Sequence, residues 1–196
     1  MKLFLKGERC LSPKCPMIKK PYPPGQRRKR RTKALSEYGK ELREKQKLKN
    51  WYNLREGQFR NYVKAALRER HKVDDAEALL IKLLESRLDN VVFRLGFAAS
   101  RNAARAMVSH RHFLVNNKVV NIPSYSIKKG DRISLDAKSL KKNILHNLTL
   151  TLKKQNPPSW LGLDAEKLEG KVIKEPVLEE ALPPAEISSI FEFYSR

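Results

Sequence analysis

The chain has 196 residues, a formal net charge of +21 and a sequence pI of about 10.1. So large a charge repels itself in a compact chain and predicts an anionic partner: nucleic acid, an anionic membrane or an acidic protein. No stretch approaches the roughly 20 apolar residues of a membrane helix, and the apolar run at the start is too short for a signal peptide, so we expect a cytosolic or organelle-matrix location.

The charge is unevenly distributed along the chain. Residues 1–50 carry a net charge of +13 and residues 101–150 carry +8, whereas residues 51–100 carry +2 and residues 151–196 carry −2. Two basic blocks therefore flank a nearly neutral stretch, and an acidic end follows. This pattern is typical of a protein with one side that faces RNA and another that faces protein or solvent.

Residues 1–35 are predicted to form an irregular basic segment. Five prolines between positions 13 and 24 exclude a long helix or a central strand. The segment ends in a basic run in which Arg27, Arg28, Arg30 and Arg31 are candidate phosphate contacts. The alternative is a targeting or nonspecific polyanion tail, and the second basic block far downstream favours specific contact with RNA.

Residues 36–86 are predicted to form a helical domain that begins with a helix over residues 36–52. Ser36 can cap this helix, because a serine side chain accepts a hydrogen bond from the first turn. Its apolar stripe is discontinuous and much of the rest is basic. We expect Lys45, Lys47 and Lys49 on this helix to contact phosphates.

Two capping-box-like patterns, Asn53-x-x-Glu56 and Asp74-x-x-Glu77, predict the starts of the next two helices. The first of these helices has a clear apolar face at i, i+3, i+4 spacing, and Arg60 on it is a candidate RNA contact. The second is predicted either to continue to about residue 95 or to break near residue 86.

Downstream of Ser100, which can cap a short helix over residues 101–109, the period changes from helical to alternating. Apolar runs at 112–115 and 118–120 flank Asn116 and Asn117, which tolerate the left-handed conformations of a tight hairpin. A turn at 129–131 precedes a third strand over 132–135, and residues 137–155 can hold a basic helix. Short strands are expected at 159–163, 170–174 and 190–194.

Arg101 and Arg105 lie four residues apart and so project from one face of the predicted helix. Guanidinium groups suit bidentate phosphate contact and stacking on exposed bases, and the helix N-terminus near Ser100 favours a phosphate. Pairing with nearby acids is disfavoured, because residues 97–130 contain no Asp or Glu. We therefore expect both arginines to contact RNA.

Four residues after this helix complete the candidate RNA contacts: Arg111, His112, Asn116 and Lys118. For His112 a packing or turn role weighs as much as a phosphate contact. Asn116 is first a turn residue and only second a donor to RNA.

Motifs along most of the chain occur in an order that points to one family. They are Tyr22-Pro23-Pro24-Gly25-Gln26, Leu83-Leu84-Glu85-Ser86-Arg87-Leu88-Asp89-Asn90, Ser100-Arg101-x-x-Ala104-Arg105, His110-x-His112, Val115-Asn116, Gly130-Asp131 and the terminal Glu192-Phe193-Tyr194-Ser195-Arg196. In this order the chain resembles bacterial-type small-subunit ribosomal protein four over nearly its whole length. Residues 87–150 resemble the RNA-binding module named after that family.

The resemblance implies an α+β fold. A helical N-terminal domain is expected to lie beside the module at 87–150, in which a helix pair packs on a short antiparallel sheet. Residues 151–196 are expected to pack back on the helical domain.

The resemblance also implies a ribosomal protein with no catalytic activity. Such a protein is a structural constituent of the small ribosomal subunit, a primary binder of ribosomal RNA that nucleates assembly of the subunit body and contributes to translational accuracy. Its implied partners are small-subunit ribosomal RNA, neighbouring small-subunit ribosomal proteins and mRNA near the entry path, with no membrane and no small-molecule substrate. Its implied location is the ribosome, in the cytoplasm or in an organelle matrix.

Three other functions are weaker. Arg87-Leu88-Asp89 superficially matches a motif around the catalytic aspartate of pseudouridine synthases, but it lies in an apolar helical run and no catalytic domain accompanies it. A stand-alone RNA chaperone would explain the module but not the flanks. A membrane-surface protein would need a bulky apolar face opposite the basic segments.

The chain departs from the family at Cys10 and Cys15. In zinc-carrying members a second cysteine pair lies upstream and completes a tetrahedral site, whereas these two thiols form half of one. We therefore expect no cofactor, and zinc only if an upstream cysteine pair precedes this chain. The alternative is two ordinary thiols in a loop.

The chain also departs from the family at Arg111 and Asn117, where the family often has glycine. If the backbone at Arg111 is left-handed, the arginine costs on the order of 1 kcal/mol, which a phosphate contact would offset. Asn117 costs less, because asparagine tolerates that conformation.

Overall fold

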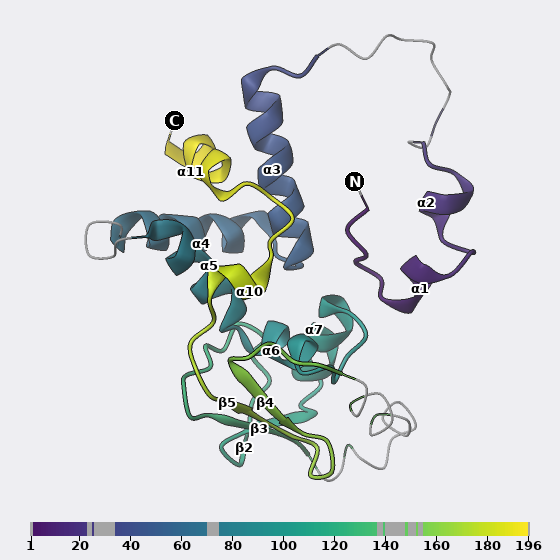
Figure 1. The fold of residues 1–196 in the computed structure, drawn as a ribbon, viewed down its shortest axis with the longest axis vertical. Helices are drawn as coiled ribbons and strands as arrows, with labels where there is room; N and C mark the ends of the chain where they lie inside the picture. Colours follow the sequence, from purple (N-terminus) through teal and green to yellow (C-terminus); the bar gives the residue numbers. More distant parts are fainter. Residues whose placement is uncertain are drawn as a thin grey trace.

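The computed structural model describes residues 2–22, 25, 34–69, 75–136, 139, 148, 152 and 155–195. Within these residues a helical part lies above a mixed part built around one sheet, and the N-terminal segment runs alongside both (Figure 1). The basic run containing Arg27, Arg28, Arg30 and Arg31 falls outside the described residues, as does most of the basic helix predicted over 137–155.

The N-terminal segment contains two short helices, α1 (Glu8–Leu11) and α2 (Pro16–Lys19), where the prolines predicted irregular structure. Pro16 is the first residue of α2, a position at which the missing N–H has no helical partner to lose. At Gly7 (φ 55°) an added Cβ would lie 2.4 Å from the carbonyl oxygen of Ala99. The absence of a side chain there lets the segment approach the loop before α7.

The helical part consists of α3 (Glu37–Trp51), α4 (Glu56–Glu69), α5 (Ala76–Glu85) and the C-terminal helix α11 (Ile187–Ser195). The Ser36 side chain accepts a hydrogen bond from the Gly39 N–H at 3.3 Å, which confirms the predicted cap of α3. Buried apolar side chains from all four helices form one core. It includes Leu48, Phe59, Val63, Leu80, Ile81 and Ile190.

Neither predicted capping box forms as expected. Asn53 has a left-handed φ of 54° and follows the end of α3, where the Leu54 N–H donates to the Lys49 carbonyl at 3.0 Å. Helix α4 therefore begins only at Glu56. For α5 the cap is Asp75, whose carboxylate accepts from the Glu77 N–H at 2.8 Å, and Asp74 lies outside the described residues.

The helical run after Asp75 breaks near residue 86, which was one of the two predicted outcomes. Helix α5 ends at Glu85 and α6 (Leu88–Arg94) begins after an extended Arg87. Backbone groups around the break bond to the segment that follows the hairpin, since Ile127 N–H donates to the Ser86 carbonyl at 2.8 Å and Leu88 N–H donates to the Tyr125 carbonyl at 2.9 Å. The break therefore joins the helical part to the mixed part.

The mixed part packs α6 and α7 (Arg101–Ser109) against an antiparallel sheet. The strands are β1 (Phe113–Val115), β2 (Lys118–Val119), β3 (Arg132–Leu135), β4 (Leu161–Asp164) and β5 (Glu169–Val172), in the order β2-β1-β3-β5-β4. Asn116 and Asn117, with φ of 50° and 65°, form the predicted tight turn between β1 and β2. The α+β fold is therefore confirmed.

The last residues of the chain contribute to both parts. Strands β4 and β5 extend the sheet beside β3, whereas α10 (Leu178–Ala181) packs on α5 and α11 packs on α3 (Figure 1). The described residues from 155 onward thus pack on the helical part through α10 and α11 and also complete the sheet through β4 and β5. The predicted strand at 190–194 is wrong, because Ile187, Ile190 and Phe191 follow a helical period and form a face of α11.

No helix among the described residues is long and apolar enough to cross a membrane.

Candidate RNA-binding site

The Arg101 side chain is half-buried among aromatic rings. Its guanidinium carbon lies 3.9 Å from the centre of the Trp51 ring, 4.5 Å from that of Phe93 and 5.1 Å from that of Tyr52. Burial lowers its pKa to about 10, although the Glu85 carboxylate opposes the shift. Arg101 therefore remains charged at neutral pH while aromatic rings cover its faces.

Arg105 shares the helix face of Arg101, as predicted, but this face is turned toward the end of α3. One Arg105 Nη1–H donates to the Asn53 carbonyl at 3.2 Å, and Asn53 Nδ2–H donates to Asn102 Oδ1 at 3.4 Å. Arg105 is half-buried by this contact. The two arginines thus lie together at the junction between α3 and α7.

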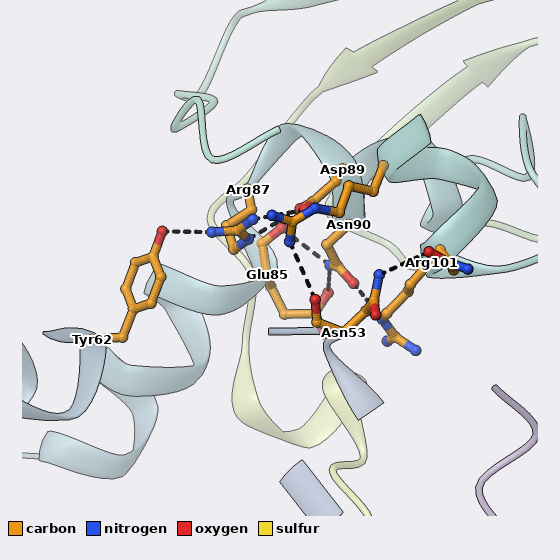
Figure 2. A network of polar contacts seen from close by, with 9 residues as sticks. Asn53, Tyr62, Glu85, Arg87, Asp89, Asn90 and Arg101 are labelled. Carbon is orange, nitrogen blue, oxygen red and sulfur yellow. Dashed lines mark hydrogen bonds and ion pairs between the residues drawn. The ribbon is translucent and has the colours of Figure 1, made fainter. Parts of the chain in front are cut away.

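Glu85 is the centre of the polar contacts at this junction. Its carboxylate is almost completely buried and accepts hydrogen bonds from Tyr52 Oη at 2.8 Å, from Asn90 Nδ2 at 2.5 Å and from Arg94 Nε and Nη2 at 3.0 and 2.7 Å. Asn90 in turn accepts from Arg101 Nε at 2.8 Å. Figure 2 shows Glu85, Asn90 and Arg101 converging from α5, α6 and α7, close to Asn53, which follows α3.

A second buried ion pair lies beside this cluster. The Arg87 guanidinium donates to both carboxylate oxygens of Asp89, at 3.0 and 2.7 Å, and also to Tyr62 Oη at 2.8 Å (Figure 2). Burial opposes the charge on Arg87, but the bonds to Asp89 and Tyr62 raise its pKa above the ordinary value. Asp89 therefore orients an arginine of the same chain.

The three lysines predicted on α3 all pair with acids of the same chain. Lys45 Nζ lies 2.7 Å from Glu56 Oε1 and Lys49 Nζ lies 3.2 Å from Glu56 Oε2, while Lys47 pairs with Glu44. The side chain of Lys45 is only 6% exposed. Lys45 is therefore placed to hold α3 against α4, and a phosphate contact by its ammonium group is not supported.

Two candidates near the hairpin also have local partners. His112 is buried and its Nδ1 lies 2.7 Å from Ser139 Oγ. Asn116 is exposed, and its side chain accepts from Arg132 N–H at 3.0 Å and donates to Asp131 at 2.8 Å. These contacts fit the packing role weighed for His112 and the turn role given first to Asn116.

Exposed cations remain on several elements. Arg60 on α4, Arg111 after α7 and Lys118 on β2 are exposed, and none forms an ion pair with a described residue. The same holds for Lys40 and Arg43 on α3, which the sequence prediction passed over. Their signal was the i, i+3 spacing on the helix face opposite the buried Glu41, Lys45 and Leu48.

The described residues supply two of the four ligands that a structural zinc ion needs. Cys15 is buried and Cys10 is half-buried, and no group of three or more His, Cys, Asp or Glu side chains gathers near them or elsewhere in the described part of the chain. The Lys2 ammonium donates to the Cys10 carbonyl. Burial raises the pKa of Cys15, but hydrogen bonds from the Met17 and Ile18 amides and the charge of Lys2 lower it overall.

Comparisons with known proteins match two successive segments to family models. The model described as the ribosomal protein S4/S9 N-terminal domain matches residues 1–85, and the S4 domain matches residues 86–133. Curated relatives named small ribosomal subunit protein uS4 match the whole chain, which covers 92% of their own length. They are 51% identical in Caldicellulosiruptor bescii, 52% in Caldicellulosiruptor saccharolyticus and 43% in Thermus thermophilus.

Proposed function

The chain belongs to the small ribosomal subunit protein uS4 family, and on this basis we propose that it nucleates assembly of the body of the small subunit and contributes to translational accuracy. As a member of this family it is an RNA-binding structural protein of the ribosome and not an enzyme. It acts in the cytoplasmic ribosome, against ribosomal RNA and neighbouring small-subunit proteins and close to the mRNA entry path. It needs no cofactor for this role.

The proposed RNA contacts are exposed cations that lack acidic partners. Arg60, Arg111 and Lys118 meet this condition among the described residues, and the run with Arg27, Arg28, Arg30 and Arg31 carries the densest charge. Such side chains bind phosphate oxygens and release counterions from the RNA, which favours binding. The single observation that carries the proposal is this excess of unpaired, exposed positive charge on a chain of the uS4 family.

The remaining predicted residues contribute to RNA binding less directly than these exposed cations. Lys47, Lys49 and Arg105 have partners within the chain but stay partly exposed, so their positive charge still adds to the field that attracts RNA. Lys45, Arg101, His112 and Asn116 hold backbone and helices in place. Their effect on RNA is therefore indirect.

The test is binding to small-subunit ribosomal RNA across a salt series, with an unrelated structured RNA as competitor. We expect tight binding that survives the competitor and weakens steeply with salt. The double variant Arg111→Ala/Lys118→Ala is expected to lower the salt slope by about two, since each lost phosphate contact lowers it by about one.

Lys167→Ala is the matched control, because Lys167 is 74% exposed on the turn between β4 and β5, in the acidic end of the chain. It removes one positive charge and should leave the salt slope within error of the parent value. Two results would overturn the proposal, because each would leave net charge alone as the cause of binding. The unrelated RNA could compete as well as small-subunit ribosomal RNA, or Lys167→Ala could lower the salt slope as much per removed charge as the double variant does.

A further inference from the structure

We propose that Arg101 is a positioning residue, which joins the end of α3 to the start of α7 so that the helical part and the mixed part present their cations to RNA as one rigid surface. The inference rests on the proposed function, since it concerns how that RNA surface is assembled. In this inference Arg101 fixes the helices that carry the RNA-contacting cations and does not itself make the direct phosphate contact predicted from the sequence.

The first support is the origin of the rings around Arg101. Trp51 and Tyr52 come from the end of α3, whereas Phe93 comes from α6. A planar guanidinium stacks on rings in a way that an ammonium group cannot reproduce. Arg101 on α7 therefore fills a slot whose walls belong to two other helices.

The second support is the use made of the N–H groups of Arg101. Nε–H is taken by Asn90 at 2.8 Å, and Nη2 is buried with no hydrogen-bond partner among the described residues. A bidentate phosphate contact uses two parallel N–H groups of one guanidinium edge. The edge formed by Nε and Nη2 is not free for such a contact.

The third support is the continuity of the contacts beyond Arg101. Asn90, which accepts from Arg101, also donates to Glu85 (Figure 2). Glu85 in turn accepts the hydroxyl of Tyr52, the residue that caps α3. Arg105 makes a second link, because it donates to the carbonyl of Asn53 just after α3. Both links fix α7 relative to α3, and with it the exposed Arg111 relative to the exposed Lys40 and Arg43 of α3.

A rigid arrangement favours binding because less conformational freedom is lost when the complex forms. Loosening the junction should therefore weaken RNA binding without removing any phosphate contact. The number of phosphate contacts is read from the salt slope, and the preorganisation of the surface is read from the affinity at fixed salt. The two roles of Arg101 thus predict different changes in one measurement.

The experiment compares Arg101→Lys with Arg111→Ala in the full chain bound to small-subunit ribosomal RNA. Arg101→Lys keeps the charge but loses the ring stacking and the bond to Asn90. We expect its affinity to fall by roughly tenfold at every salt concentration with an unchanged slope. Arg111→Ala should instead lower the slope by about one.

Trp51→Leu tests the same contact from α3 without touching any charge, and it serves also if Arg101→Lys proves too unstable to purify. We expect a similar parallel loss of affinity, and a double variant whose loss is clearly smaller than the product of the two single losses. Thermal unfolding of each variant is measured at the same time, and the affinities are compared where all are folded.

Three results would overturn the inference. Arg101→Lys could bind as the parent does while Arg101→Ala lowers the slope by about one, which identifies a direct phosphate ligand. The effects of Arg101→Lys and Trp51→Leu could be independent. A loss of thermal stability with unchanged RNA affinity would show a merely structural role. If the unrelated RNA competes equally for the parent chain, that result contradicts the proposed function and not the role of Arg101.

Discussion

At the scale of single residues, the backbone at Arg111 shows the clearest tension between fold and function. Its φ of 61° lies in the left-handed region, where its N–H still donates to the Val108 carbonyl at 2.9 Å and so ends α7. A non-glycine residue is strained there. A contact between the exposed guanidinium and an RNA phosphate would offset this strain. Such a contact would explain why arginine occupies a position that suits glycine.

Arg111→Gly is expected to raise the free energy of unfolding by about 1 kcal/mol, because glycine adopts this φ without strain. The same change should lower the RNA salt slope by about one. Urea unfolding and the salt series measure the two effects on one variant. Asn117→Gly, at φ 65°, is the control: it should give a smaller gain in stability, since asparagine tolerates this conformation, and no change in slope.

Residue roles were predictable from the sequence where they depend on near neighbours. The hairpin residues Asn116 and Asn117 and the cap Ser36 belong to this group. The burial of Lys45 was not predictable, because the rings of Phe193 and Tyr194 that cover it come from the other end of the chain. The ring contacts of Arg101 were not predictable for a similar reason, since they form only where α3, α6 and α7 meet.

At the scale of elements, the end of α5 carries an acid where the helix dipole disfavours one. Glu85 is the last residue of α5, and the unpaired carbonyls of a helix end carry partial negative charge. Its carboxylate is nonetheless buried, because Arg94, Asn90 and Tyr52 surround it. Burial, together with the nearby Glu85 charge, raises the pKa of Tyr52 well above its ordinary value.

Glu85→Gln is expected to lower the free energy of unfolding by about 3 kcal/mol, because it leaves the largely buried Arg94 without its counter-charge. The control is Glu175→Gln, which removes an ion pair to Lys82 of similar length, 2.6 Å, whose side chains are 42% and 64% exposed. That change should cost less than about 1 kcal/mol. Equal losses in urea unfolding would contradict the role given to burial.

Most elements could be predicted from their periodicity and caps, and the exceptions have physical causes. The apolar residues of 190–194 suggested a short strand, but the stretch is part of a helix whose apolar face extends back to Ile187. Strands β4 and β5 were expected at about the right places, yet the pairing of β5 with β3 could not be read from the sequence. Pairing across such a distance depends on the whole core.

At the scale of the whole molecule, the C-terminal helix α11 returns to pack on α3 and α4. The Tyr194 hydroxyl donates to Glu56 at 2.7 Å, across 138 positions of sequence. Burial acts to raise the pKa of Glu56, but hydrogen bonds from Lys45, Tyr194 and Lys49 outweigh it and lower the pKa to about 2. The ionised carboxylate therefore ties α11 to the junction of α3 and α4.

The contacts of Glu56 predict that the free energy of unfolding depends on pH. Since the folded pKa of Glu56 lies below its ordinary value of 4.5, its stabilising effect is complete above about pH 4.5 and disappears as the pH falls to about 2. Glu56→Gln should lower the free energy of unfolding by about 1 kcal/mol or less at pH 7, because Glu56 is 45% exposed. In urea unfolding from pH 7 to 2, a difference between parent and variant that did not shrink in this window would refute the prediction.

The late position of α11 and β4–β5 constrains how the protein is made. A ribosome synthesises a chain from its N-terminus. The apolar faces around Leu48 and Phe59 therefore lack their packing partners Ile187 and Ile190 until the last residues have been added. The sheet likewise lacks two of its strands until residue 172 has been added. A prematurely terminated chain therefore carries nearly all the positive charge of the protein. It lacks the closed core that holds the charged side chains in a fixed arrangement.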